Sequence, residues 1–185
     1  MQFPDLETPR LKLTQLSKND TASIFTLFSN EAVIKYYDLT AFKNASQATE
    51  LITFFNTRFE SGLGIRWAIR LKESNELIGT CGFNSWNEKM KQAVLGYDLL
   101  PSHWRGGYTS EAVEKIIQAA FSGQLACADI NRIQADTIPG NTGSEALLLK
   151  AGFIKEGLRR EAGYWKNKFH DLWCFGLIKS DFITD

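Results

Sequence analysis

The sequence lacks the features that define several large classes of protein. It has neither a GxxxxGK[ST] segment nor a GxGxxG segment after a first strand, so neither an NTP-binding P-loop nor a dinucleotide-binding fingerprint is predicted. Basic and acidic residues number 21 each, and no basic stripe suggests direct nucleic-acid binding. Residues 1–7 do not resemble a secretory signal, and no apolar run is long enough to cross a bilayer. We therefore expect a cytoplasmic protein that binds neither nucleic acid nor membrane.

Cysteine is also scarce. Cys81, Cys127 and Cys174 lie far apart, and no CxxC pair occurs, which argues against a zinc ribbon or a redox dithiol. We expect reduced cysteines within a core, and no metal site. The sequence offers no prediction of the oligomeric state.

What the sequence does contain is a continuous series of strand and helix patterns. Alternating or continuous apolar runs predict strands, and apolar residues at helical spacing predict helices. The predicted strands cover residues 10–16, 65–71, 77–83, 92–100 and 131–138, followed by two antiparallel strands from 153 that turn near 166–168. The predicted helices begin near 17, cover 46–59 and 109–124, and begin again at 142 with the spacing of a capping box. This order predicts a mixed α/β (α+β) fold around one sheet, with residues 1–185 forming a single domain.

The most informative segment joins the strand at 92–100 to the helix at 109–124. It contains the glycine pair Gly106-Gly107, and glycine lets a backbone approach a ligand closely. The first amides of a helix are unpaired, and together with the helix dipole they form a site for an anion such as a pyrophosphate. Arg105 could add a charge-assisted contact, and Glu111 complements the helix dipole. A tight turn without a ligand would have the same pattern, so these residues alone leave both interpretations open.

The residues around this turn resemble the central motif of the GCN5-related N-acetyltransferases (GNAT). Trp104, Gly107, Tyr108 and the run Ser110-Glu111-Ala112 match a W-G-x-G-Y-x-[ST]-E-A pattern, while Arg105 and Thr109 depart from the family's pyrophosphate signature. Residues 141–153 resemble the family's N-x-x-[AS]-x-x-L-Y-x-K-x-G-F segment. Residues 7–11, 157–161 and 169–171 are similar to the branch that acetylates the N-termini of ribosomal proteins.

The resemblance implies a fold and an acetyl-CoA site. The fold would be a mostly antiparallel sheet of about seven strands flanked by about four helices, and its central strands would splay apart at 94–100 and 132–138. The pantetheine arm would lie between these strands and pair with free backbone groups of Leu99 and Leu100. Asn141 would contact the arm, although a helix cap explains it equally well. The pyrophosphate would bind the segment Arg105, Gly106, Gly107, Tyr108, Thr109 and Ser110.

The resemblance also suggests catalytic candidates, with one departure from the family. Leu148 stands where many relatives carry a tyrosine that protonates the leaving sulfur. Ser144, one turn along from Asn141, is the alternative proton donor, unless it only satisfies backbone groups in the first turn of its helix. Asp136 is a candidate base acting through water. Asp98 is its rival, and both could instead be solvated charges on the sheet.

The implied activity is direct transfer of acetyl from acetyl-CoA to a primary amine. A protein α-amine, with a pKa near 8, needs a weaker base than lysine, whose pKa is near 10.4. Tyr36 and Tyr37 could form a wall of the acceptor site or simply pack, and Glu161 could hold the amine. Two alternatives stay open. One is an acetyltransferase acting on a polyamine, amino acid or antibiotic, and the other is a CoA-binding sensor without turnover, which the leucine at 148 would favour.

Overall fold

The computed structural model describes residues 2–125 and 129–182. Their strands are β1 (Leu6–Glu7), β2 (Leu11–Gln15), β3 (Ile65–Leu71), β4 (Leu77–Asn87), β5 (Gln92–Leu99), β6 (Arg132–Thr137), β7 (Ile154–Trp165) and β8 (Lys168–Ile178). Their α-helices are α1 (Thr21–Ser29), α2 (Glu31–Ile34), α3 (Ala45–Glu60), α4 (Tyr108–Phe121) and α5 (Thr142–Lys150). Short 3-10 turns occupy Lys18–Asp20, Pro101–His103 and Lys179–Asp181.

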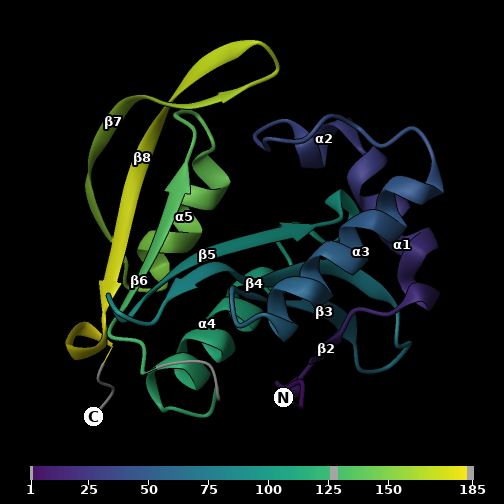
Figure 1. The fold of residues 1–185 in the computed structure, drawn as a ribbon, viewed down its shortest axis with the longest axis horizontal. Coiled ribbons are helices and arrows are strands. Elements are labelled where there is room, and N and C mark those ends of the chain that lie inside the picture. Colours follow the sequence, from purple (N-terminus) through teal and green to yellow (C-terminus); the bar gives the residue numbers. More distant parts are fainter. Residues whose placement is uncertain (1, 126–128, 183–185) are drawn as a thin grey trace.

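All eight described strands form one sheet in the order β1-β2-β3-β4-β5-β6-β8-β7 (Figure 1). Neighbouring strands are antiparallel except β5 and β6, which run parallel. The predicted α/β class and mostly antiparallel sheet are confirmed. The expected seven strands and four helices become eight and five in the described residues. The additional elements, β1 with two residues and α2 with four, are too short to produce a periodic pattern.

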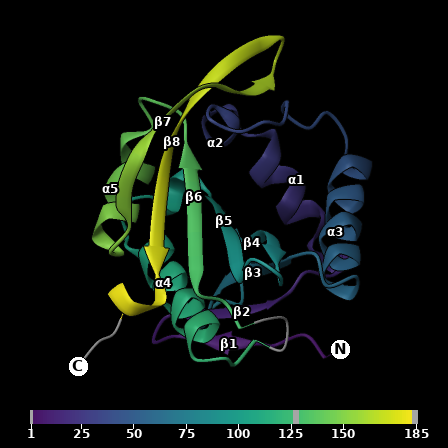
Figure 2. The ribbon, with the colours of Figure 1, turned by 60° about the vertical axis from the view of Figure 1, so that its left-hand side comes forward.

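The sheet is covered by different helices on its two faces (Figure 2). The apolar side of α4 packs with side chains of β2, β3 and β5 in one cluster of buried residues. Helices α1 and α3 pack together in a second cluster, which takes Ala68 from β3. Alternation along β3 explains the division, because Trp67 and Ile69 point to the first cluster and Ala68 to the second.

The long helices begin and end close to their predicted bounds. Helix α3 starts after Asn44, whose side chain accepts a hydrogen bond from the Gln47 amide, while the Gln47 side chain accepts one from the Asn44 amide. Helix α4 ends three residues before the predicted limit. Gly123 there takes a φ of +74°, a left-handed conformation that terminates helices.

The central strands β5 and β6 separate along their length. They pair only through Gln92–Val94 and Arg132–Gln134. Beyond that point β5 stays on β4 as far as Leu99, and β6 stays on β8 as far as Thr137. The predicted splay is therefore present, and it opens the sheet at its middle.

Strands β7 and β8 form a long hairpin that extends beyond the rest of the sheet and leans toward α2 (Figure 1). Its turn lies at Lys166 and Asn167, where we predicted it, and both residues have positive φ angles, of 51° and 56°. At the tip, the Lys166 ammonium donates to the Ile34 carbonyl over 2.8 Å. The hairpin is thereby tied to the segment that follows α1.

Two cysteines lie in the described residues, and both are free. Cys81 is fully buried, and burial raises the pKa of its thiol to about 12. Cys174 is half-buried, and Cys127 lies outside the described residues. Across residues 2–125 and 129–182, no cluster of acidic, histidine or cysteine side chains has the make-up of a metal site, and no helix combines the length and apolar character of a membrane span.

Candidate active site

A cavity of about 1360 Å³ extends from the N-terminus of α4 across the splay of β5 and β6 to α2 and the hairpin. Its volume exceeds that of sites for drug-sized molecules, so it leaves room for a long ligand and a second substrate. Most of the predicted site residues line it, namely Tyr36, Tyr37, Asp98, Leu99, Arg105, Gly107, Tyr108, Thr109, Ser110, Asp136, Asn141 and Ser144. Leu100, Gly106 and Glu161 do not line it.

The turn before α4 forms one end of the cavity. Arg105 and Gly107 both have positive φ angles, of 63° and 77°. Alternation of left-handed residues with others along a turn points successive backbone amides to one side. The amides from Gly107 to Ser110 donate to no atom of the described chain, and the helical ladder begins with Glu111 donating to the Gly107 carbonyl. These amides are available to an anion. Arg105 holds a left-handed conformation that glycine, the residue of the W-G-x-G-Y pattern at this position, would adopt without strain.

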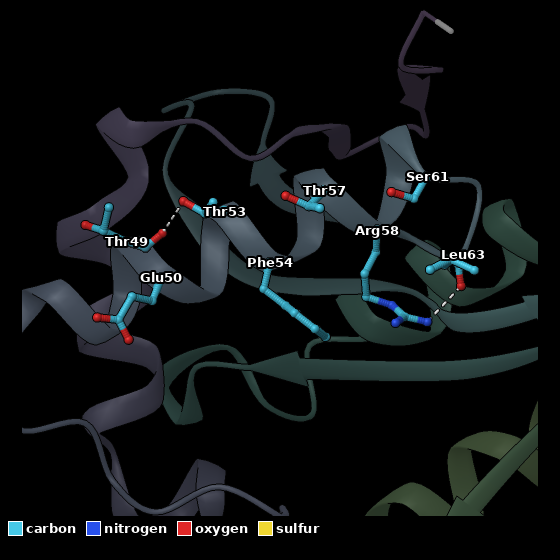
Figure 3. Close-up of a pocket in the computed structure, with 8 residues that line it drawn as sticks. All are labelled: Thr49, Glu50, Thr53, Phe54, Thr57, Arg58, Ser61 and Leu63. Atoms are coloured by element: carbon cyan, nitrogen blue, oxygen red, sulfur yellow. Dashed lines mark hydrogen bonds between the residues drawn. The ribbon is translucent and has the colours of Figure 1, made fainter.

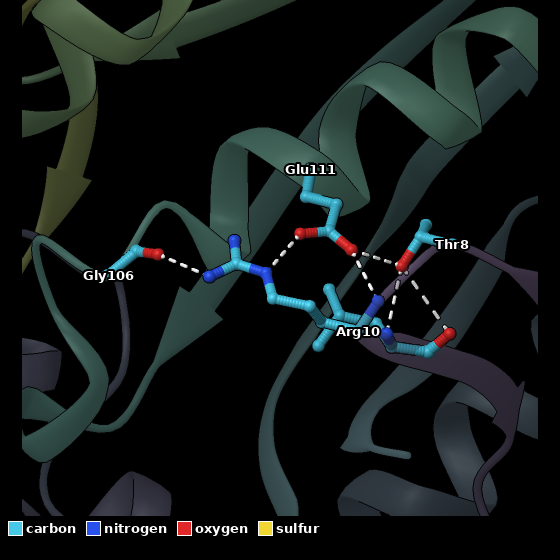
Figure 4. A network of polar contacts seen from close by, with 5 residues as sticks. Thr8, Arg10, Gly106 and Glu111 are labelled. Carbon is cyan, nitrogen blue, oxygen red and sulfur yellow. Dashed lines mark hydrogen bonds and ion pairs between the residues drawn. The ribbon is translucent and has the colours of Figure 1, made fainter.

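A network of polar contacts between residues 8–10 and the start of α4 holds this turn in place (Figure 4). The Glu111 carboxylate accepts hydrogen bonds from the Thr8 hydroxyl at 2.5 Å, the Arg10 amide at 2.9 Å and the Arg10 Nε at 2.7 Å. Arg10 also donates to the Gly106 carbonyl and lies 4.4 Å from the centre of the Tyr108 ring. Burial raises the pKa of Glu111, but the bonds from Thr8 and Arg10 outweigh it and hold the pKa below its ordinary value. Glu111 thus anchors the turn.

The backbone at the end of β5 differs from the expectation. The Leu100 amide donates to the Ile78 carbonyl at 2.8 Å, and the Leu100 carbonyl accepts from the His103 amide at 2.9 Å. The Leu99 carbonyl accepts from the Trp104 indole at 2.8 Å. The prediction of free backbone groups is therefore wrong for the Leu99 carbonyl and for the amide and carbonyl of Leu100. The reason is that the chain folds back through a 3-10 turn immediately after β5.

Helix α5 carries the predicted proton donor into the cavity. Its N-cap is Asn141, whose side chain accepts from the Ser144 amide at 3.4 Å, so the capping box predicted to start at Thr142 is wrong by one residue. Leu148, one turn further on, is fully buried. The Ser144 hydroxyl lies 2.6 Å from the Tyr97 hydroxyl of β5, and both residues line the cavity. The serine is therefore held by a side chain from the opposite strand.

Asp98 belongs to a buried polar network. Its carboxylate accepts from the Arg66 guanidinium and, at 3.0 Å, from the Thr80 hydroxyl. Arg66 also donates to Thr80 and to Asn84, each over 2.9 Å. Burial raises the pKa of Asp98, and the Arg66 charge opposes that shift. The alternative of a solvated charge is wrong for Asp98, because it is 5% exposed and engaged by two donors, which also leaves it poorly placed as a base.

Gly96 makes this network possible. A Cβ at this position would lie 2.6 Å from the Asn84 amide nitrogen and 2.8 Å from an Arg66 nitrogen. Only a residue without a side chain lets the guanidinium lie across β5.

The second candidate base, Asp136, lines the cavity with its side chain 26% exposed. Its carboxylate pairs with Arg159 of β7 at 2.5 Å. Glu161, by contrast, lies in an irregular stretch of β7 where the register shifts between Arg159 and Gly163, and its φ is +51°. The Glu161 amide donates to Asp171 at 2.8 Å, and the exposed side chain is not part of the cavity wall. The prediction that Glu161 holds the amine came from the family resemblance, which does not reveal this irregularity of β7.

The far end of the cavity is aromatic. The Tyr36 hydroxyl donates to the Gly140 carbonyl at 3.0 Å and so connects the α2 segment to the loop before α5. Tyr37 packs its ring edge-on against Phe28, 5.7 Å away, and burial raises the pKa of its hydroxyl. Trp165 of the hairpin lines the same end and stacks on His170 with ring centres 4.3 Å apart.

A second, smaller hollow of about 560 Å³ lies along α3 (Figure 3). Three threonines line it, but the Thr53 hydroxyl donates to the Thr49 carbonyl at 2.9 Å, and the Thr49 hydroxyl donates to Ala45 at 3.3 Å. The hydroxyls of Thr49 and Thr53 are satisfied by their own helix, and the hollow offers a largely apolar wall.

Tyr97 and Arg66 are the site residues to which the sequence assigned no role. Strand alternation offers a signal for both. Tyr97 shares a face of β5 with Leu95 and Leu99, whereas Asp98 points to the other face, where Arg66 and Thr80 lie on neighbouring strands. Identifying the partners of Tyr97 and Arg66 requires the register between strands, which cannot be read from the sequence.

Comparison with known proteins gives one consistent result. Residues 10–154 match the family described as Acetyltransferase (GNAT) domain. An uncharacterized N-acetyltransferase of Bacillus subtilis, YoaA, is 38% identical over 177 residues, which cover 96% of this chain and 98% of that protein. The ribosomal-protein-serine acetyltransferase of Escherichia coli is 32% identical over 107 residues, or 57% of each chain.

Solved structures share the fold at low sequence identity. A structure of RimL, a ribosomal L7/L12 alpha-N-protein acetyltransferase in complex with coenzyme A, has a TM-score of 0.84 at 20% identity and covers 95% of this chain and 98% of that one. The microcin C7 self-immunity acetyltransferase MccE, in complex with acetyl-CoA and AMP, has a TM-score of 0.83 at 22% identity, over 92% and 93% of the two chains.

Proposed function

The chain belongs to the acetyltransferase (GNAT) family, and from that premise we propose that it transfers acetyl from acetyl-CoA directly to the α-amine of a protein. One observation supports the acetyl-CoA site above all others. The unpaired amides of Gly107 to Ser110 face a cavity that continues to the splay between β5 and β6. Such amides at a helix N-terminus suit a pyrophosphate, and unpaired strand edges suit the amides of a pantetheine arm.

The residues around the cavity suggest a division of roles. Arg105 and the turn would bind the phosphates, and Asn141 would orient the start of α5. Thioester aminolysis requires the amine to lose a proton and the sulfur to gain one. Ser144 is the proposed proton donor to the sulfur, and Asp136, through water, is the proposed acceptor from the amine. Much of the acceleration would come from holding the amine against the thioester.

A protein α-amine is the acceptor that best suits this cavity. Of the two predicted carboxylates, Asp98 is bound by Arg66 and Thr80, and Asp136 is paired with Arg159. Neither arrangement favours a strong base, and an α-amine with a pKa near 8 is already partly neutral at pH 7, whereas a lysine is not. The similarity to a ribosomal-protein-serine acetyltransferase supports the same acceptor class.

The test is transfer to matched peptides. Purified protein with acetyl-CoA is offered peptides with a free N-terminal serine or alanine, the same peptides blocked at the N-terminus but containing lysine, and a set of polyamines. Free thiol is titrated and products are identified by mass spectrometry. We expect acetylation of the free N-termini, and Ser144→Ala should lower kcat while nearly preserving acetyl-CoA affinity.

Two other results would reject this assignment. Acetylation confined to polyamines or lysine would identify a different acceptor class. Tight acetyl-CoA binding by calorimetry, without product from any amine, would indicate a sensor.

A further inference from the structure

We infer that Tyr97 is a positioning residue that holds the Ser144 hydroxyl toward the leaving sulfur, an inference that rests on the proposed function. The two hydroxyl oxygens lie 2.6 Å apart. Tyr97 stands three residues beyond Val94, the last residue of β5 that pairs with β6, and Ser144 belongs to the helix that follows β6. Their hydrogen bond therefore links the two sides of the splay.

Either hydroxyl could donate in this bond, and the proposal assigns the donor role to Tyr97. Burial raises the pKa of Tyr97, so the phenol keeps its proton across the working pH range. The Ser144 hydroxyl oxygen at 2.6 Å is a closer acceptor for that proton than the Ser144 carbonyl at 3.5 Å. With Tyr97 donating, the proton of the serine is left to point elsewhere, into the cavity.

The tyrosine compensates for a side chain that helix α5 does not provide. Leu148 lies one turn beyond Ser144 on the same face of the helix and carries no proton to donate. A serine alone in the first turn of a helix tends to bond nearby backbone groups. Tyr97 supplies a phenol from the opposite wall, which competes with those groups and keeps the serine directed at the cavity.

The proton transfer balances as follows. The carbon–sulfur bond breaks with its electron pair on sulfur, and the Ser144 proton moves to that sulfur. The serine oxygen regains a proton from water, while Tyr97, whose pKa is raised by burial, keeps its own proton and its hydrogen bond to the serine. The proton lost by the amine passes to water. The products are an amide and a thiol, and neither Ser144 nor Tyr97 changes its charge.

A double-mutant cycle tests this coupling. Tyr97→Phe, Ser144→Ala and the double variant are compared with the wild-type protein, and Tyr164→Phe, at an exposed position on the hairpin, is the matched control. Thiol release from acetyl-CoA is measured with the peptide acceptor and separately with hydroxylamine. The second nucleophile reports on the leaving sulfur whatever the natural acceptor is, so a wrong acceptor class does not obscure the result.

We expect Tyr97→Phe to lower kcat about tenfold while the KM for acetyl-CoA changes less than about twofold. The double variant should be no slower than Ser144→Ala, because both changes remove one shared step. Thermal melting checks that each variant is folded. An unchanged kcat in Tyr97→Phe, or losses that multiply in the double variant, would overturn the inference. If hydroxylamine shows the coupling while no peptide is acetylated, the acceptor proposal fails and the role of Tyr97 stands.

Discussion

The two ends of the cavity are built in opposite ways. At the α4 end, Arg105 and the four consecutive residues from Gly107 to Ser110 line the cavity. At the α2 end, Tyr36, Asp98 and Trp165 come from three segments that lie far apart in the chain. The first end is a local structure that a motif can encode. The second depends on strand register and on a long hairpin, so it is free to differ between relatives that share the first.

The largest effect should come from removing the buried ion pair at the α2 end of the cavity. Asp98→Asn removes the charge opposite Arg66, whose side chain is 2% exposed, and should cost about 3–5 kcal/mol of unfolding free energy. Chemical denaturation measures the loss. Asp129→Asn is the control, because the pair of Asp129 with Lys91 lies at the surface, and it should leave the unfolding midpoint unchanged. Equal effects of the two substitutions would mean that burial does not distinguish these pairs.

At the other end, Gly107→Ala should impair binding more than stability. A side chain at a φ of +77° costs about 1–2 kcal/mol, which is roughly a tenfold loss of acetyl-CoA affinity if the turn relaxes to another shape. Gly123→Ala introduces the same kind of strain at +74°, outside the cavity wall, and its affinity should match wild type. Calorimetry with acetyl-CoA compares them. Comparable affinity losses in both variants would argue against the turn as the phosphate site.

A smaller effect is expected from a substitution at the α2 end of the cavity, and it tests whether the two ends act separately. Tyr36→Phe removes the hydrogen bond to Gly140, worth about 0.5–1.5 kcal/mol, and should loosen the aromatic end alone. We expect the KM for the acceptor to rise about two- to tenfold, with acetyl-CoA affinity unchanged. Steady-state kinetics with each substrate varied in turn gives both values, and a rise confined to acetyl-CoA would contradict the assignment of this end.

The smallest expected effect concerns the anchor behind the turn. Because the pKa of Glu111 is held below 4.5, its contribution to stability is complete above that value and disappears as the pH falls through the lowered pKa. Wild type should therefore melt above Glu111→Gln by a few degrees at about pH 7, and this difference should shrink toward about pH 3. A difference that stays constant with pH would exclude the ionised carboxylate as its source.

The same division explains what could be predicted from the sequence. The turn at Arg105 to Ser110 and the splay follow from local patterns and the family resemblance, whereas the N-cap of α5 lies one residue before its predicted position. The bonds of Leu100 do not, because they depend on how the chain folds back through Pro101. Asp98 was placed on the correct strand, but its burial depends on Arg66, 32 residues away. Glu161, assigned to the amine site by the resemblance, lies in an irregular stretch of β7 and does not line the cavity.

The anchor of the turn also has a consequence for folding during synthesis. Arg10 and Glu111 are separated by 101 residues, yet their contact holds the backbone that faces the phosphate site. A growing chain exposes Thr8 and Arg10 early, while α4 is still to be translated. The segment with Thr8 and Arg10 must therefore stay available until the 101 residues up to Glu111 have been made, and only then can the turn acquire its final shape.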